Sequence, residues 1–422
     1  MNKLSNYGVQ NLSVSEAEAI IRGRVRAFPT ESVPLDRAIG RVLREEIRAD
    51  RDFPPFDRIT MDGIALSFAS YERGTATFKI QETQGAGRPK AELRNDAGCI
   101  EVMTGGVLPA GCDCVVPVEH YERFAEIVAL KPGVKPTRLQ NVNLQGSDYH
   151  AGEVLLSPGA LLRAPEIAVC ASVGKDVIMT SRSPRIALIT TGDELVGIDE
   201  TPEPYQIRIS NCYAMEAALR SAGYEHCVGF HLPDDREIIR SSLQRVFVEY
   251  DLVVLSGGVS QGKFDYLPEL LEELGVIRHL HKVRQRPGRP LWFGETPEGV
   301  PVFALPGNPV SSLVCLFRYV LPFLGACTER VAPVQAETAA TTKREQLCAI
   351  LADTVEGLQD LTFFLPVKVA LLPEGRILAH PQPVHGSGDF ASLVRSDGFL
   401  ELPEGQGRIP AGSSWPFYRW RI

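Results

Sequence analysis

The chain has 422 residues, which is too long for one ordinary core, so two to four domains are expected. Its apolar fraction of 44% is typical of a globular protein with a large buried core. The formal net charge of -8 argues against nucleic acid or an anionic membrane as the main partner, because both attract basic surfaces.

The cysteines and the first residues bear on the compartment. Nine cysteines are present, and no two have the C-x-x-C spacing of a zinc or redox site. The opening MNKLSNYGVQ lacks the apolar core of a signal peptide, and no apolar stretch is expected to be long enough to span a bilayer. We therefore expect a protein of the reduced cytoplasm, with no membrane among its partners.

The predicted elements change character along the chain. LSVSEAEAIIRGRV opens with Ser13 and Ser15 before an acidic turn, which predicts a helix start. Over residues 52–147 short β-branched runs alternate with glycine and proline turns, which predicts a β-rich unit. Over residues 185–324 buried strands alternate with helices, which predicts a mostly parallel sheet. After residue 331 short strands return, and a small closed β-module is expected.

Three loops that follow strands of the α/β unit have an unusual composition. They are TTGDEL (190–195), SGGVSQGKFD (256–265) and LPGNPVSS (305–312). Ligands of open α/β sheets bind beyond the carboxyl ends of the strands, where these loops are expected to meet. Amide donors, a helix N-terminus and carboxylates suit a phosphate or another oxyanion, with Mg²⁺ on carboxylate oxygens. Neither a Walker loop nor a G-x-G-x-x-G fingerprint is present, which counts against ATP-dependent phosphoryl transfer and hydride transfer.

Each loop also has a purely structural alternative. The glycine pair 257–258 suits any tight strand-to-helix turn, and the acidic pair 193–194 suits a solvated loop. Asp234 stands three residues before Glu237, and this spacing favours a capping box over a ligand role. Either Ser210 or Asn211 is the expected cap of the preceding helix. Only the joint placement of the three loops favours a binding site.

A basic cluster and an acidic turn complete the candidates. Residues 277–293 (IRHLHKVRQRPGRPLWF) hold five lysines and arginines, and Arg286-Pro287-Gly288-Arg289 forms a turn suited to gripping one oxyanion with two guanidinium groups. A charge-blunted edge strand is the alternative. In the β-rich unit, Asp62 lies in a Met-Asp-Gly turn and Thr104 in MTGG, and an Asp-Gly turn by itself has a conformational explanation.

In this order, the motifs TMDGIA, MTGG, TTGDEL, LSGGVSQGKFDY and LPGNPVSS resemble those of molybdopterin molybdenumtransferases, the MoeA/gephyrin family. The resemblance covers nearly the whole chain, and residues 386–405 are similar to the family's C-terminal barrel motif. It implies a multidomain α/β plus β fold with an elongated subunit. The implied parts are a discontinuous linking domain (7–47 and 151–182), an inserted β-rich domain (48–150), a molybdopterin-binding-type α/β domain (183–328) and a C-terminal β-barrel (329–422).

The resemblance also implies a reaction: molybdate is inserted into adenylylated molybdopterin, AMP is released and molybdenum cofactor forms, with a divalent cation, usually Mg²⁺, assisting. The implied homodimer has its active site between the α/β domain of one subunit and the β-rich domain of the other. This chemistry suits the motifs, because basic groups, amides and a metal offset the repulsion between a polyanionic substrate and an oxyanion.

The family's functional positions carry over to particular residues. Those implied to be catalytic are Asp62, Thr104, Glu194 and Asp265, of which Glu194 and Asp265 are also the implied metal ligands. Those implied to bind substrate are Ser256, Gly257, Gly258, Ser260, Asp148, Asp234, Arg286, Arg289, Pro306, Gly307, Asn308, Pro309 and Ser387.

Three departures from the family pattern affect fine specificity, including the choice between molybdate and tungstate. DRITMDGIA (57–65) differs at several positions from the usual run, and Gly146-Ser147-Asp148 lacks the usual glutamate. Arg286 and Arg289 stand where lysines are usual, so planar forks replace point charges.

Two other functions are kept as alternatives. The adenylylating transferase of the same pathway shares the α/β module but is a single-domain protein, and it would make the adenylate from molybdopterin and Mg-ATP. A non-catalytic scaffold is the second alternative, because animal members of the family also anchor receptors. The presence together of Asp62, Glu194 and Asp265 favours an enzyme.

Overall fold

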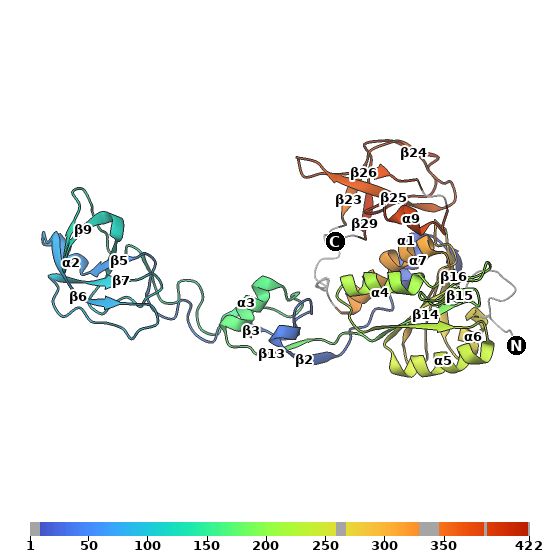
Figure 1. The fold of residues 1–422 in the computed structure, drawn as a ribbon, viewed down its shortest axis with the longest axis horizontal. Helices are drawn as coiled ribbons and strands as arrows, with labels where there is room; N and C mark the ends of the chain where they lie inside the picture. Colours follow the sequence, from blue (N-terminus) through green and yellow to red (C-terminus); the bar gives the residue numbers. More distant parts are fainter. Residues whose placement is uncertain (1–8, 259–266, 329–345, 384–385, 421–422) are drawn as a thin grey trace.

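The computed structural model describes residues 9–258, 267–328, 346–383 and 386–420. Figure 1 shows an elongated molecule with a β-rich lobe at one end. A narrow segment leads from it to an α/β unit and a β-barrel, which lie together at the other end. The multidomain α/β plus β architecture expected from the sequence is confirmed.

The α/β unit is built on a seven-stranded sheet in the order β1-β19-β21-β22-β18-β14-β17. The strands are β1 (Val9–Leu12), β14 (Ile186–Thr191), β17 (Cys227–Leu232), β18 (Leu252–Ser256), β19 (Ile277–Val283), β21 (Trp292–Glu295) and β22 (Pro301–Leu305). Six of them, β17, β14, β18, β22, β19 and β1, point the same way, whereas β21 is antiparallel to both its neighbours. Strand β18 is buried along its whole length, as expected for a parallel strand covered on both faces.

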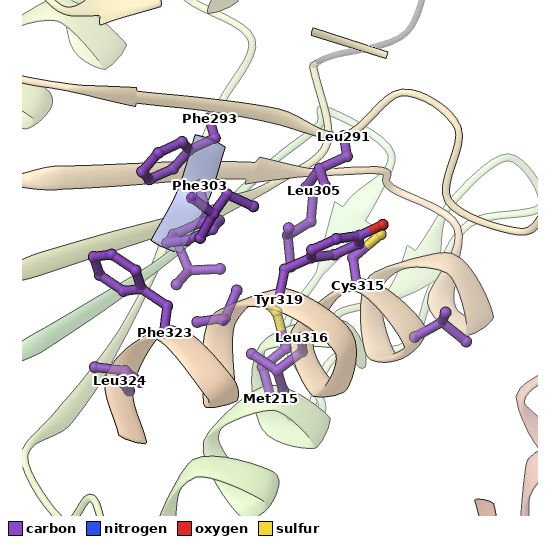
Figure 2. Packing of buried hydrophobic residues seen from close by; sticks show 14 of the residues in the cluster. Met215, Leu291, Phe293, Phe303, Leu305, Cys315, Leu316, Tyr319, Phe323 and Leu324 are labelled. Carbon is purple, nitrogen blue, oxygen red and sulfur yellow. The ribbon is translucent and has the colours of Figure 1, made fainter. Parts of the chain in front are cut away.

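Two helical layers cover this sheet. One face carries α1 (Val14–Arg22), α4 (Asn211–Ser221), α7 (Pro309–Cys315), the π-helical turn η3 (Leu316–Val320) and α8 (Leu321–Cys327). The other face carries α5 (Arg236–Glu249) and α6 (Leu267–Glu273). Alternate residues of β14 enter the two cores, Ile186 and Leu188 on the first face and Ala187 and Ile189 on the second. Figure 2 shows the first core, where Phe293 and Phe303 pack against Phe323.

The N-terminal segment packs on the α/β sheet. Ser13 caps α1 in the predicted way: its Oγ accepts the Glu16 N–H and the Glu16 carboxylate accepts the Ser13 N–H. Strand β1 pairs with β19, and α1 buries Ala17 and Ile21. The sequence grouped these residues with the linking domain (7–47), and the structure differs there because their apolar side chains join the α/β core.

One expectation about apolar stretches is wrong. Residues Pro309–Cys327 form a helical run of 19 residues that is apolar enough, by length and composition, to cross a bilayer. Its most apolar window is 67% buried inside the protein, because the run lies along the sheet. Its composition is therefore that of a core helix.

The β-rich domain contains a six-stranded sheet in the order β8-β5-β7-β6-β10-β9, with apolar clusters on both faces. Its elements are β4 (Arg58–Ile59), β5 (Gly63–Leu66), α2 (Phe68–Glu72), β6 (Thr77–Gln84), β7 (Gly98–Val102), β8 (Cys114–Pro117), η2 (Val118–His120), β9 (Tyr121–Phe124), β10 (Ile127–Leu130) and β11 (Val142–Asn143).

The narrow segment has a small core of its own, which includes Val33, Leu43, Ile47, Leu162 and Ile178. It is built from two antiparallel strand pairs, each of which joins the outgoing chain to the returning chain. Its elements are β2 (Thr30–Pro34), η1 (Leu35–Arg37), β3 (Ile47–Arg48), β12 (Val154–Leu156), α3 (Ala164–Ser172) and β13 (Val177–Ser181).

The C-terminal strands close into a barrel, because β25 pairs with both β26 and β27. Its elements are β23 (Cys348–Leu351), β24 (Val355–Glu356), β25 (Thr362–Leu371), β26 (Ile377–Pro381), α9 (Phe390–Leu393), β27 (Gly398–Leu402), β28 (Arg408–Ile409) and β29 (Ser414–Arg419). The short strand β20 (Gln285–Arg286) leaves the α/β unit to pair with β25.

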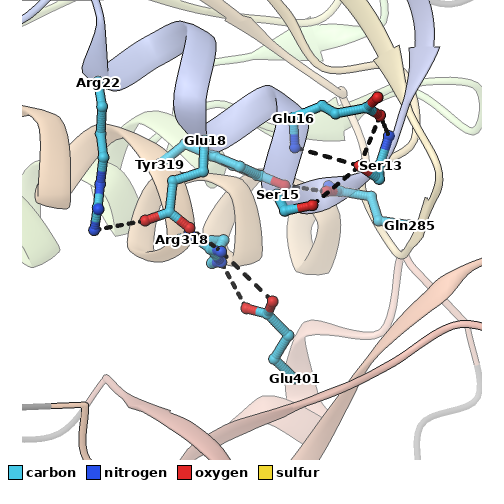
Figure 3. Close-up of polar contacts among 9 residues, drawn as sticks. All are labelled: Ser13, Ser15, Glu16, Glu18, Arg22, Gln285, Arg318, Tyr319 and Glu401. Atoms are coloured by element: carbon cyan, nitrogen blue, oxygen red, sulfur yellow. Dashed lines mark hydrogen bonds and ion pairs between the residues drawn. The ribbon is translucent and has the colours of Figure 1, made fainter. Parts of the chain in front are cut away.

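Arg318 ties three parts of the fold together, as Figure 3 shows. Its side chain is buried and lies 2.6 Å from Glu18 Oε2 of α1 and 2.6 Å from Glu401 Oε2 of β27. It also contacts the ring of Tyr418. The barrel is therefore fixed to the α/β unit by a buried, doubly paired charge.

Candidate active site

A cleft of about 570 Å³ opens at the carboxyl ends of β14, β18 and β22. The register of the parallel strands places Ser256 beside both Thr190 and Leu305, so the loops that follow meet. All three loops predicted from the sequence contribute lining residues: Glu194, Ser256, Gly257, Gly258, Pro306, Gly307, Asn308 and Pro309, joined by Asp234. The expectation that they meet at one sheet edge is confirmed.

The glycine at 257 has a geometric requirement. Its φ is +106°, and a Cβ there would lie 2.9 Å from the carbonyl oxygen of Thr191. A Cβ on Gly307 would lie 3.5 Å from Gly257 Cα, so the second and third loops are in close backbone contact. The glycine pair therefore has the structural role of a tight turn as well as a place in the binding site. The glycines let the loops approach one another and keep the cleft open.

Asn211 joins the loops, and it was expected only as a helix cap. Its Nδ2 donates to Ser256 Oγ at 2.9 Å and to the Gly307 carbonyl oxygen at 2.7 Å. Ser210 is the residue at the N-cap position, and no side-chain capping bond accompanies it. The sequence signal for this role was weak: an amide side chain at the start of a helix that follows a loop at the edge of the sheet. The residues that Asn211 contacts are 45 and 96 positions away in the sequence.

The capping prediction for Asp234 is wrong. Asp235 is the cap of α5, since its Oδ1 accepts the N–H groups of Glu237 and Ile238. Asp234 instead lines the cleft, and its N–H donates to Asp193 Oδ1 at 3.0 Å. Asp193 is exposed to solvent, as the alternative had it, and its side chain also fixes the loop at Asp234.

A second cleft of about 560 Å³ adjoins the first and shares Pro290, Asn308 and Ser311 with it. Arg286, Arg289 and Ser387 line this second cleft, together with Phe363 and other residues of the barrel. The side chain of Asn308 bridges to the barrel region, because its Nδ2 donates to Ser387 Oγ at 2.7 Å. The two clefts therefore meet at Asn308.

The basic cluster does not act as a unit. Arg278 pairs with Glu272 at 3.2 Å, and Arg284 pairs with Glu404 at 3.0 Å. Only Arg286 and Arg289, of the cluster's arginines, line either cleft among the residues that the structure describes. The edge-strand alternative is wrong for β19, which has β1 on one side and β21 on the other. It holds for Arg286, because β20 is the edge strand of the barrel sheet.

Asp62 and Thr104 come together within the β-rich domain. The backbone N–H and the Oγ1 of Thr104 each donate to Asp62 Oδ1 at 2.7 Å. These bonds hold the pKa of Asp62 below its ordinary value, since they favour the carboxylate. Asp148 lies in the same domain, where its N–H donates to the Phe53 carbonyl oxygen.

These three residues are not brought to the clefts within one chain. In Figure 1 the domain that carries β5, directly after Asp62, lies at the opposite end of the molecule from β14 and β16 (Ile207–Arg208). Asp265 and Ser260 lie outside the described residues.

The donor set suits a hard cation. Glu194 and Asp234 both line the first cleft, and carboxylate oxygens are the ligands that Mg²⁺ prefers. Within the described ranges no group of three or more metal-ligating side chains exists. Mg²⁺ commonly binds one or two carboxylates and completes its shell with water and substrate phosphates, so the residues fit such an ion.

Models of three protein families match the chain. Residues 12–174 match the MoeA N-terminal region (domain I and II), 187–326 a probable molybdopterin binding domain, and 349–420 the MoeA C-terminal region (domain IV).

Similar proteins match over nearly their whole length. A molybdopterin molybdenumtransferase of Synechocystis sp. is 41% identical over 410 residues, which cover 97% of this chain and 100% of that protein. One of Synechococcus elongatus is 32% identical, with 95% and 98% covered. The crystal structure of a molybdopterin biosynthesis MoeA protein from Pyrococcus horikosii superposes with a TM-score of 0.78 at 27% identity, and 98% and 100% of the chains are covered.

Proposed function

Since the chain belongs to the molybdopterin molybdenumtransferase family, we propose that it inserts molybdate into adenylylated molybdopterin, with release of AMP. It is a transferase of molybdenum cofactor biosynthesis. The observation that carries the proposed reaction is the pair of adjoining clefts. One is lined by loops and carboxylates, the other by two arginines, and they meet at Asn308.

The first cleft is the proposed site for the phosphate-bearing part of the adenylate. Helix α4 has 11 residues and starts at this cleft, so the positive end of its dipole favours a phosphate there. The side-chain-poor backbone at Gly257 and Gly307 allows a bulky ligand to approach closely. Ser256 and Asn211 hold the loops in this arrangement.

The second cleft is the proposed site for molybdate. Two guanidinium groups on one turn supply charge-assisted donors for an oxyanion. The adjoining position of the two clefts brings the oxyanion beside the substrate, and the arginines offset the repulsion between the two negative groups.

A divalent cation, Mg²⁺, is part of the proposal. Glu194 would hold it in the first cleft, with Asp265 as the second ligand that the family resemblance implies. When bound, the cation would supply positive charge to offset that of the phosphates. Removal of divalent ions by a chelator is expected to stop AMP release, and addition of Mg²⁺ to restore it.

We further propose a homodimer in which Asp62 and Thr104 complete the site of the partner subunit. The support is that their domain, which carries β5, lies at the opposite end of the molecule from β14 (Figure 1), and that exposed apolar side chains surround them. Met61, Met103 and Val118 flank this turn with 41%, 44% and 51% of their surface exposed. Exposed apolar groups around a functional carboxylate suit a surface that docks on another protein.

The location proposed for the protein is the cytoplasm. All nine cysteines are free thiols in the structure, and eight of them are buried. Free thiols persist in a reducing compartment, which is the setting that the sequence also favours.

A turnover assay tests the reaction directly. Purified protein, adenylylated molybdopterin, molybdate and Mg²⁺ are expected to yield AMP and molybdenum cofactor, and Glu194→Gln and Asp265→Ala to lose both products. Formation of the adenylate from molybdopterin and Mg-ATP, without use of molybdate, would instead identify the adenylylating alternative. No product in either assay would favour the scaffold.

A further inference from the structure

Three buried polar side chains lie directly beneath the turn that carries Arg286 and Arg289. Gln285, Cys315 and Tyr319 have exposures of 1%, 0% and 2%, and the apolar core surrounds them. Polar groups in such a place cost free energy unless they are bonded to one another or to the backbone. The reaction proposed above assigns none of them a role.

The three side chains form one connected network. Tyr319 Oη donates to Gln285 Oε1, and Gln285 Nε2 donates to the Gly288 carbonyl oxygen at 3.1 Å. Cys315 Sγ lies 3.7 Å from the same carbonyl oxygen and 3.5 Å from Gln285 Nε2. The network thus ends on the backbone of the turn itself.

Little space separates the turn from this network. Gly288 has a φ of +95°, and a Cβ there would lie 2.6 Å from Cys315 Sγ and 2.6 Å from Gln285 Nε2. The turn is also bound from its ends, since the Val283 N–H donates to the Arg289 carbonyl oxygen at 3.0 Å. Any shift of the buried side chains would therefore move the backbone between the two arginines.

The π-helical turn η3 orients the network. Its i→i+5 bonding widens the helix and changes the direction in which its residues project. Figure 2 shows Tyr319 and Cys315 together on the side of the helix near Leu291. Figure 3 shows Tyr319 bonded to Gln285, while the adjacent Arg318 turns to Glu18 and Glu401. One helical turn thus supports both the arginine turn and the barrel contact.

Burial also keeps the donors protonated. It raises the pKa of the Cys315 thiol to about 12 and the pKa of the Tyr319 hydroxyl well above its ordinary value. Both groups remain neutral donors across the physiological pH range.

We propose that Gln285, Cys315 and Tyr319 are positioning residues of the oxyanion site, which set the Arg286–Arg289 turn so that both guanidinium groups address one molybdate. The inference rests on the proposed function of the second cleft. It specifies how a core network below that cleft decides affinity for the oxyanion. Two guanidinium groups can bind one oxyanion together only if the backbone that carries them is held in a fixed conformation. A buried network that contacts the turn holds it in this way.

The test compares two single-hydroxyl deletions by steady-state kinetics. Tyr319→Phe removes the donor to Gln285 and is expected to raise the KM for molybdate by about 3- to 10-fold, the equivalent of one lost hydrogen bond. The KM for adenylylated molybdopterin is expected to stay unchanged. Tyr418→Phe is the matched control, because it removes the hydroxyl of another tyrosine, which is partly buried beside Arg318 and lines neither cleft.

Further arms separate the possible outcomes. Cys315→Ala removes the thiol below Gly288 and is expected to raise the KM for molybdate in the same way, so the test stands even if Tyr319→Phe folds poorly. If Arg289→Ala leaves that KM unchanged, the oxyanion assignment of the second cleft fails and the inference falls with it. If Arg289→Ala raises it while Tyr319→Phe and Cys315→Ala do not, the positioning role alone is overturned.

Discussion

At the scale of single residues, the charged form of the Asp62 carboxylate is stabilised by hydrogen bonds from Thr104. Two donors from Thr104 reach one of its oxygens, and the side chain is otherwise exposed. The bonds lower its pKa, so the carboxylate form persists as the pH falls below the ordinary value of 3.8. Such a group can offer a fixed negative charge to a ligand at any physiological pH.

Asp62→Asn is expected to lower kcat for cofactor formation by at least about 100-fold, the loss typical of removing one positioned polar group from an active site. The melting temperature is expected to change little, because the side chain is exposed. Thr104→Ser is the matched control, since it keeps both donors to Asp62 and is expected to retain most activity. AMP release and a thermal melt measure both properties; near-full activity of Asp62→Asn would remove this residue from the mechanism.

At the scale of elements, a salt bridge joins the narrow segment to the α/β sheet. Arg182, just after β13, donates from Nη1 to Oδ2 and from Nη2 to Oδ1 of Asp251, just before β18, each at 2.8 Å. The Arg185 N–H donates to the same carboxylate. Burial alone would raise the pKa of Asp251, but these bonds outweigh it and hold the pKa below the ordinary 3.8.

The stability contributed by Asp251 is therefore fully present above its unfolded pKa and lost as the pH falls through the lower folded pKa. Asp251→Asn is expected to destabilise the protein by about 1–3 kcal/mol at pH 7, the usual effect of leaving charged donors partly unpaired. The difference from the wild type should shrink once the pH drops below about 4, near the ordinary value. Urea unfolding at several pH values measures this, and a difference that grows toward acid would contradict it.

The elements also show what a sequence can and cannot predict here. The α/β unit and the meeting of its three loops follow from local hydrophobic patterns, because parallel strands put their ends at one edge. Asn211, Cys315 and Tyr319 lay beyond such reasoning, since their partners are between 27 and 96 residues away and no local pattern marks them. Asp234 was misassigned because the spacing to Glu237 also fits a capping box, whereas Asp235 makes the cap.

At the scale of the whole molecule, substitution of Arg318 tests how the barrel is attached to the α/β unit. Arg318→Leu would leave Glu18 and Glu401 without a buried partner and is expected to destabilise the protein by about 3–5 kcal/mol. The control is Arg22→Ala, which breaks the i,i+4 pair between Glu18 and an exposed arginine and should cost only about 0.3–0.5 kcal/mol. Equal midpoints of urea unfolding for the two variants would show that the buried pair does not hold the barrel.

The proposed homodimer makes a quantitative prediction for mixed subunits. Asp62→Asn and Glu194→Gln should each be inactive alone, because every site then lacks one group. After unfolding and refolding together, half of the dimers are mixed and each contains one intact site, so activity should return to about a quarter of wild type. If no activity returns although mixed dimers form, the two residues do not serve a shared site.

The strand pairing in the narrow segment makes the inserted β-rich domain easy to replace in evolution or by design. Strand β3 leaves for the β-rich domain directly beside β12, on which the chain comes back, with Arg48 paired to Val154. The exit and the re-entry are thus one inter-strand spacing apart, about 5 Å. A domain inserted between two such paired strands can be lengthened, exchanged or removed without a change in the strand register of the narrow segment.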